Sequence, residues 1–91
     1  MNRHIVVLAR RDSLEAMRVA AGLTIFGHEV DLVLMCEPLT EEQMQSEQFE
    51  LLDLADIEPF TTNPAMSDIF KPLAIVELGQ IINSADAVEN L

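Results

Sequence analysis

Residues 3–35, RHIVVLARRDSLEAMRVAAGLTIFGHEVDLVLM, decide the fold of this chain. Residues 3–9 form a continuous apolar run rich in β-branched side chains, which is typical of a strand buried on both faces of a parallel sheet. The next stretch predicts a helix over residues 14–26 that ends at Gly27, because glycine readily adopts the backbone conformation that closes a helix. Residues 28–35 predict a second strand. Strand, helix and strand joined by short connections make a right-handed βαβ unit.

The middle of the chain continues this alternation. Thr40, with Gln43 three residues later, has the pattern of a capping box and opens a helix predicted to run to about Ala55. Residues 56–62 predict a short third strand. Proline cannot donate a hydrogen bond to a neighbouring strand, so Pro59 indicates an edge strand or a bulge.

The last third predicts a loop over residues 63–72, a helix over residues 73–83 and a strand over residues 86–91. Alternating strands and helices indicate an α/β protein. We therefore predict a single domain over residues 1–91, with a mostly parallel sheet of four strands, or five if one extra short strand is present, and with helices on both faces. The side chains of the last helix that we expect to face inward are Ile75, Leu78, Ile81 and Ile82.

The charge of the chain excludes several partners. The formal net charge is −11, and four of the five basic residues lie within residues 3–18. Contact with nucleic acid or with an anionic membrane needs lysine and arginine to neutralise phosphates, so neither is expected, whereas a basic protein partner is compatible with this charge. No apolar run approaches the roughly 20 residues of a membrane span. The run at residues 5–9 is too short for a secretion signal, so we expect a cytoplasmic protein.

The apolar content of 49% is high for a domain of 91 residues. A chain of this size buries only about 60–65% of its unfolded surface, which leaves apolar side chains exposed. We therefore expect a homo- or hetero-oligomer. The single cysteine excludes an intrachain disulfide and a zinc–cysteine cluster.

Residues 10–13 are the first candidate site, because ligands of open α/β sheets bind beyond the carboxyl ends of the strands. Arg10 and Arg11 precede a helix whose cap is Asp12, with Ser13 as a nearly equal alternative and Glu15 completing a capping-box pattern. Free backbone N–H groups at such a helix start favour an anion. The stretch has no glycine, so it is neither a dinucleotide fingerprint nor a phosphate loop, and no cofactor is predicted. The alternative is that the two arginines pair with acids of the same or a neighbouring chain.

Cys36 is the second candidate. It follows the second strand at the same edge of the sheet, together with Glu37 and residues 61–63. A reactive thiol needs a nearby cation or helix N-terminus, and Glu37 acts against this, so Cys36 is either a nucleophile or sulfur acceptor, or a small packing residue. The two histidines, His4 and His28, fall at the opposite edge and are expected to be structural. No metal site is predicted.

Three stretches resemble the DsrE/DsrF/DsrH-like proteins. These are RDSLEAMRVAAGLTIFGHEVDLVLM at residues 11–35, LLDLADIEPFTTN at residues 51–63 and ELGQIINSADAV at residues 77–88. The resemblance implies a compact α/β domain that forms dimers, trimers or hexamers. It also implies a place among sulfur-relay proteins, which pass persulfide sulfur between proteins. The family's sulfur-accepting cysteine follows the third strand, where this chain has FTTNPAMSD at residues 60–68 and no cysteine.

We therefore expect an oligomerising accessory or non-catalytic DsrE-like subunit that works with itself, with related subunits or with a sulfur-relay partner. One alternative is a sulfurtransferase-type sulfur carrier using Cys36. The other is a small-anion or nucleotide-binding module using Arg10 and Arg11, with Asp12 and Ser13 in the site.

Overall fold

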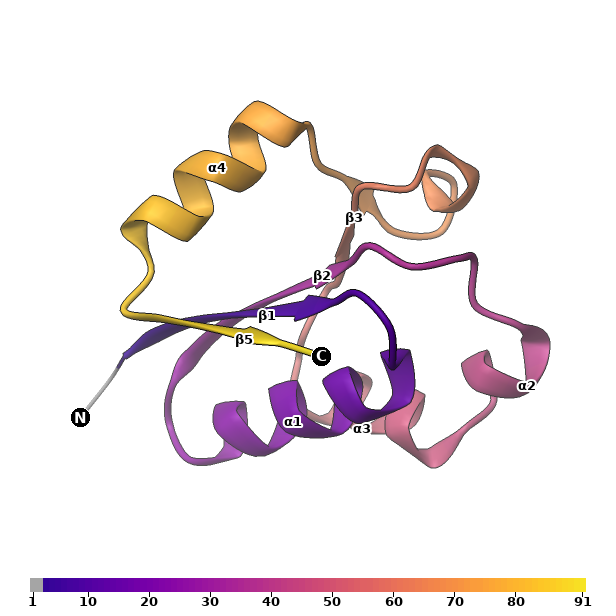
Figure 1. The fold of residues 1–91 in the computed structure, drawn as a ribbon. Coiled ribbons are helices and arrows are strands. Elements are labelled where there is room, and N and C mark those ends of the chain that lie inside the picture. Colours follow the sequence, from indigo (N-terminus) through magenta and orange to yellow (C-terminus); the bar gives the residue numbers. More distant parts are fainter. Residues whose placement is uncertain (1–2) are drawn as a thin grey trace.

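A computed structural model describes residues 3–91, and its core is a fully parallel sheet of five strands with helices on both faces (Figure 1). The strand order is β4-β3-β2-β1-β5. The predicted α/β class, the parallel sheet and the extra short strand are confirmed. In chain order, the elements are β1 (His4–Ala9), α1 (Ser13–Ile25), β2 (Glu29–Leu34), α2 (Glu41–Met44), α3 (Glu47–Leu54), β3 (Phe60–Thr61), a short 3-10 helix (Pro64–Met66), β4 (Lys71–Pro72), α4 (Ile75–Ser84) and β5 (Ala87–Asn90).

Strand β1 is buried on both faces from residue 5 to residue 9, as its continuous apolar run predicts, and the second half of β2, residues 32–34, is buried in the same way. Side chains alternate along a strand, so one residue set of β1 and β2 faces α1 and α3, and the other set faces α4. The first set is Ile5, Val7, Ala9, Leu32 and Leu34. The second set is Val6, Leu8 and Val33.

The handedness of the crossovers explains which helix covers which face. The steps from β1 to β2 and from β2 to β3 move in the same direction across the sheet, so their helices α1 and α3 pack on the same face. The step from β4 to β5 crosses back over the whole sheet and places α4 on the other face (Figure 1). None of the helices within residues 3–91 is long and apolar enough to cross a membrane.

Helix α1 begins and ends as predicted, with one difference. Asp12 is the N-cap, and its carboxylate accepts the Glu15 N–H at 3.1 Å. Gly27 has a φ of 92°, the left-handed conformation that glycine favours. Glu15 does not complete a capping box, because its side chain binds Arg18 while the Asp12 N–H donates to the Leu91 carbonyl.

The predicted helix over residues 40–55 is wrong as one continuous element. The Thr40 capping box is present, but α2 ends after Met44. Ser46 then caps α3, because its Oγ accepts the Phe49 N–H at 3.2 Å while donating to the Gln43 carbonyl at 2.6 Å. The serine side chain therefore replaces backbone hydrogen bonds that a continuous helix would have made.

The segment after α3 also differs from expectation. Strand β3 contains only Phe60 and Thr61 and lies inside the sheet, because the predicted loop contains the edge strand β4. Pro59 precedes β3, so the edge position that we inferred for this strand is wrong. In α4, Leu78 is buried, but Ile75 points to solvent with 81% of its surface exposed, so its expected inward position is wrong.

Candidate functional site

The parallel strands bring the ends of β1, β2 and β3 to one edge of the sheet, where the connecting loops surround an open depression of about 640 Å³. All of the lining residues follow one of these three strands. They are Arg10, Arg11, Ser13, Met35, Cys36, Glu37, Pro38, Thr40, Gln43 and Asn63. The structure thus brings together most of the residues that the sequence indicated from separate stretches, and it adds the cap residues Thr40 and Gln43, whose sequence pattern indicated only helix formation.

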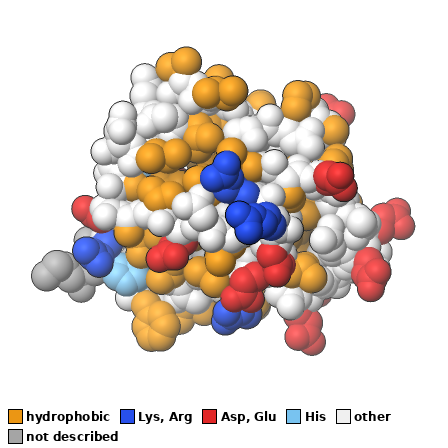
Figure 2. Space-filling view, in the orientation of Figure 1, with side chains coloured by type: hydrophobic (Ala, Val, Ile, Leu, Met, Phe, Trp, Pro, Cys, Tyr) orange, Lys and Arg blue, Asp and Glu red, His pale blue; other side chains and the backbone are white. Residues whose placement is uncertain are grey.

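The two arginines are held at this depression by the end of β5. The backbone N–H groups of Arg11 and Asp12 donate to the Leu91 carbonyl at 3.0 and 3.2 Å, and the Leu91 N–H donates to the Leu8 carbonyl at 2.9 Å. Both arginine side chains are exposed, and neither forms an ion pair with a residue in the described range 3–91. Figure 2 shows Lys or Arg side chains gathered near the middle of this view, close to where Figure 1 shows the end of β1.

The start of α1 contributes less to an anion site than the sequence suggested. The carboxylate of Asp12 already accepts a backbone N–H from the first turn of α1, and it places a negative charge there. Asp12 does not line the depression, although Ser13 does. The cationic character of the depression therefore comes from the side chains of Arg10 and Arg11.

The strand order reverses between β1 and β5, which is the position where open α/β sheets commonly bind ligands. A smaller depression of about 280 Å³ lies there, lined by Arg10, Arg11, Asp12, Asn90 and Leu91. The two arginines thus line both depressions. The Leu91 carbonyl already accepts two N–H groups at this position, so the larger depression has more free polar groups.

Cys36 lines the larger depression and is half-buried, and it belongs to neither apolar cluster of the core. Its Sγ lies 2.7 Å from the Oγ of Ser13, which is itself buried at the start of α1. Its carbonyl accepts a hydrogen bond from the Asn63 side-chain amide at 3.0 Å. These contacts fix the loop after β2 to α1 on one side and to the loop after β3 on the other.

Asn63 is the rim residue whose role the sequence did not reveal. Besides binding the Cys36 carbonyl, its Oδ1 accepts the Ala65 N–H at 3.0 Å and starts the short 3-10 helix. The buried Thr61 supports it, because the Thr61 Oγ1 donates to the Leu34 carbonyl and accepts the Asn63 N–H. The predicted position of residues 61–63 at this edge is confirmed by these contacts.

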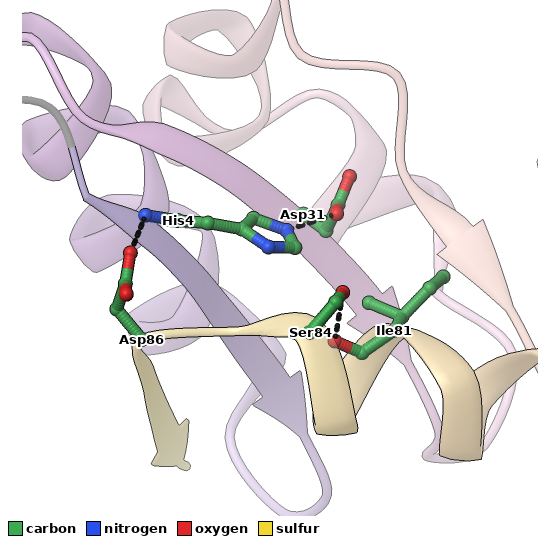
Figure 3. A network of polar contacts seen from close by, with 5 residues as sticks. All are labelled: His4, Asp31, Ile81, Ser84 and Asp86. Atoms are coloured by element: carbon green, nitrogen blue, oxygen red, sulfur yellow. Dashed lines mark hydrogen bonds and ion pairs between the residues drawn. The ribbon is translucent and has the colours of Figure 1, made fainter.

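The opposite edge of the sheet carries the histidines, of which Figure 3 shows His4. His4 Nε2 lies 2.6 Å from Asp31 Oδ2, and the His4 N–H donates to the Asp86 carboxylate at 2.8 Å. The hydrogen bond with Asp31 raises the pKa of His4. The network joins β1, β2 and the turn into β5, which is a structural role. His28 Nδ1 is buried and has no hydrogen-bond partner among residues 3–91. Within residues 3–91, no group of three or more His, Cys, Asp or Glu side chains is arranged to hold a metal ion.

The fold and the site define the class of the molecule as a parallel α/β domain with a cationic, thiol-containing depression at the carboxyl ends of its strands. Comparison with protein-family models, with curated proteins and with solved structures found no match to this chain.

Proposed function

We propose that this chain is an accessory, non-catalytic module of DsrE-like architecture that binds a small anion between its strand ends. The observation that carries this proposal is the open depression that Arg10 and Arg11 share with Ser13 and Asn63. Guanidinium groups without an ion-pair partner offer several N–H donors to phosphate, sulfate or carboxylate oxygens. Hydroxyl and amide side chains at the same depression supply additional neutral hydrogen bonds.

We propose a non-catalytic module because of the kinds of titratable side chain that line the larger depression. Among the described residues that line the depression, the titratable groups are Arg10, Arg11, Cys36 and Glu37. Histidine, the commonest general acid or base, is not among them, since both histidines lie at the other edge of the sheet. This chemistry suits holding an anion better than transforming it.

Thermal unfolding with inorganic phosphate, sulfate and thiosulfate tests anion binding. We expect a rise in Tm that grows with anion concentration, because an anion that binds only the folded state stabilises it by mass action. Arg10→Gln and Arg11→Gln should each reduce this rise. Arg18→Gln is the matched control, since Arg18 lies outside the depression and pairs with Glu15. An equal response of all three variants would show general screening of charge and would refute a site.

A sulfur carrier at Cys36 is the second candidate, favoured by the half-buried Sγ that lines the depression beside Ser13 Oγ and near two cationic side chains. In this reaction the Cys36 thiolate attacks the outer sulfur of a donor persulfide. A new S–S bond forms at Cys36, and the donor leaves as a thiolate. Incubation with a persulfide donor should add one sulfur to the intact mass of the protein but not to Cys36→Ala. An unmodified wild-type protein would exclude this function.

Self-association is the remaining part of the proposal, in line with the DsrE-like resemblance and a place in the cytoplasm. It is supported by apolar side chains that are more than 70% exposed at the end of α1 and the start of α4, namely Ile25, Phe26, Ile75 and Val76. Sedimentation velocity at micromolar concentration should show a species larger than a monomer. A monomer throughout would remove self-association from the proposal while leaving anion binding intact.

A further inference from the structure

A second depression, of about 520 Å³, lies between α3 and the segment that leads into β4, and no arginine is among the residues that line it. Its apolar floor is formed by the buried Leu52 and Phe70 together with the half-buried Phe49 and Ile57. The rings of Phe49 and Phe70 meet edge to face, with centroids 6.2 Å apart. Ile69 forms part of the wall and keeps 57% of its surface exposed. We call this depression the α3–β4 groove.

Three acidic side chains, Glu50, Asp53 and Glu58, surround the apolar floor. All three are exposed, and none is in an ion pair with any residue from 3 to 91. The one lysine of the chain, Lys71, also lines the groove, but its Nζ lies over the Phe60 ring at 5.6 Å from the centroid. The groove therefore combines an apolar floor with three carboxylates and a single lysine, which gives it a net acidic border.

We propose that the α3–β4 groove docks a basic amphipathic segment of a partner protein. Apolar side chains of such a segment would cover Phe49, Phe70 and Ile69, as amphipathic peptides do in hydrophobic grooves. Its lysine or arginine side chains would then face the three carboxylates. The net charge of −11 attracts a basic partner over about 10 Å at moderate salt and speeds its association.

The same charges disfavour the other occupants. Nucleic acid and anionic membranes would bring more negative charge to an acidic border. A second copy of this chain carries the same −11, and its few basic side chains are four arginines within residues 3–18 and Lys71. A basic segment is the occupant that compensates both the carboxylates of the groove and the charge of the whole chain.

The test uses a fluorescein-labelled amphipathic peptide built of leucine and lysine, titrated with the full chain and followed by fluorescence anisotropy. Ile69→Gln should weaken binding about fivefold, because it removes exposed apolar surface from the groove wall. Leu54→Gln is the matched control, since it removes an exposed apolar side chain of α3 that does not line the groove. The triple variant Glu50→Gln, Asp53→Asn and Glu58→Gln should weaken binding about tenfold and reduce its dependence on salt.

The acidic control has the same change in net charge at other exposed positions, Glu41→Gln, Glu42→Gln and Glu89→Gln. Equal weakening by both triple variants would mean attraction to the whole chain and would overturn the groove. Equal affinities of Ile69→Gln and Leu54→Gln, or equally tight binding of a peptide with glutamate in place of lysine, would overturn it as well. Self-association that Ile69→Gln abolishes would assign the groove to a second copy and would also overturn the proposal.

Discussion

The two faces of the sheet are covered very differently. Helices α1 and α3 cover one face and bury a cluster that includes Met17, Leu32 and Leu34, all without measurable exposure. On the other face α4 stands alone, and the buried cluster beneath it is much smaller. Figure 2 shows hydrophobic side chains uncovered in the region between α4 and β5. The asymmetry follows from topology, because the crossovers that contain α1 and α3 step in the same direction, whereas the crossover that contains α4 steps back.

The comparison of the two faces indicates which one contributes more to the stability of the fold and which one has apolar surface free for binding. A face covered by two helices can bury large side chains completely, whereas a face covered by one helix leaves part of its apolar surface available. Stability should therefore depend mainly on the α1 and α3 face, and substitutions beneath α4 should have smaller effects.

Met17→Ala should have the largest effect of the substitutions considered. Met17 lies in α1 and is fully buried against the sheet, so its truncation removes apolar contacts and leaves a cavity between two packed layers. We expect a loss of about 3 kcal/mol in the free energy of unfolding. Urea unfolding followed by circular dichroism measures this loss. A loss below about 1 kcal/mol would show that the face is less tightly packed than its burial indicates.

Leu78→Ala should cost less, although it also truncates a large side chain. Leu78 is the buried residue of α4, with 8% of its surface exposed, and the layer around it is open at one side. A cavity there can be filled by rearrangement or by water, so we expect a loss of about 2 kcal/mol, at the low end for such truncations. The same urea experiment compares the two variants. A loss equal to that of Met17→Ala would contradict the difference between the faces.

The sequence predicted the well-covered half of the molecule better than the other parts. The stretch from β1 to β2 was assigned almost to the residue, because a continuous apolar run, an N-cap at Asp12 and a closing glycine at Gly27 all act locally. The position of strand β4 was missed because the strand has only two residues, one of them Pro72, and exists only through pairing with β3. The break before Ser46 was missed because a serine within a helical pattern carries no unique signal.

The candidate site shows the same division. The gathering of Arg10, Arg11, Ser13 and Cys36 follows from the parallel arrangement alone, since parallel strands end at one edge. The contact of the loop after β1 with the Leu91 carbonyl could not be predicted in this way, because it joins residues about eighty positions apart in the sequence. The α3–β4 groove was also not predicted, since Ile69, Phe70 and Lys71, which line it, belong to a segment that the sequence predicted as a loop.

The N-caps of α1 and α4, which lie on opposite faces of the sheet, offer a smaller and more local comparison. Asp12 caps α1 with its side chain, whereas Ala74 at the same position of α4 has no side-chain acceptor. Asp12→Ala should therefore cost about 1 kcal/mol, and Ala74→Asp should stabilise the protein by roughly 0.5–1 kcal/mol. Asp12→Asn keeps the acceptor and is the control that should leave stability nearly unchanged. Urea unfolding of the three variants is the measurement, and a destabilised Ala74→Asp would show that capping does not limit α4.

The smallest expected effect lies at the edge of the thinly covered face, where His4 and Asp31 meet close to the end of α4 (Figure 3). The hydrogen bond and charge of Asp31 raise the pKa of His4 in the folded protein, with smaller contributions from the Ser84 carbonyl and Glu29, while burial opposes the shift. The stabilisation is therefore complete below the ordinary histidine pKa of about 6.5 and disappears as the pH rises through the higher folded value. The pair is partly exposed, so we expect an effect below about 1 kcal/mol.

Urea unfolding of wild type and His4→Gln at about pH 6 and about pH 9 isolates this contribution, because the charged fraction of His4 falls as the pH rises between these values. The wild type should lose stability relative to His4→Gln as the pH rises, and Asp31→Asn should largely remove this difference by removing the charge that holds the proton. An opposite slope would mean that burial outweighs the carboxylate. In that case less water would reach the edge of the sheet beneath the end of α4 than the exposure of the neighbouring residues indicates. Helix α4 would then cover its face of the sheet more completely than we infer.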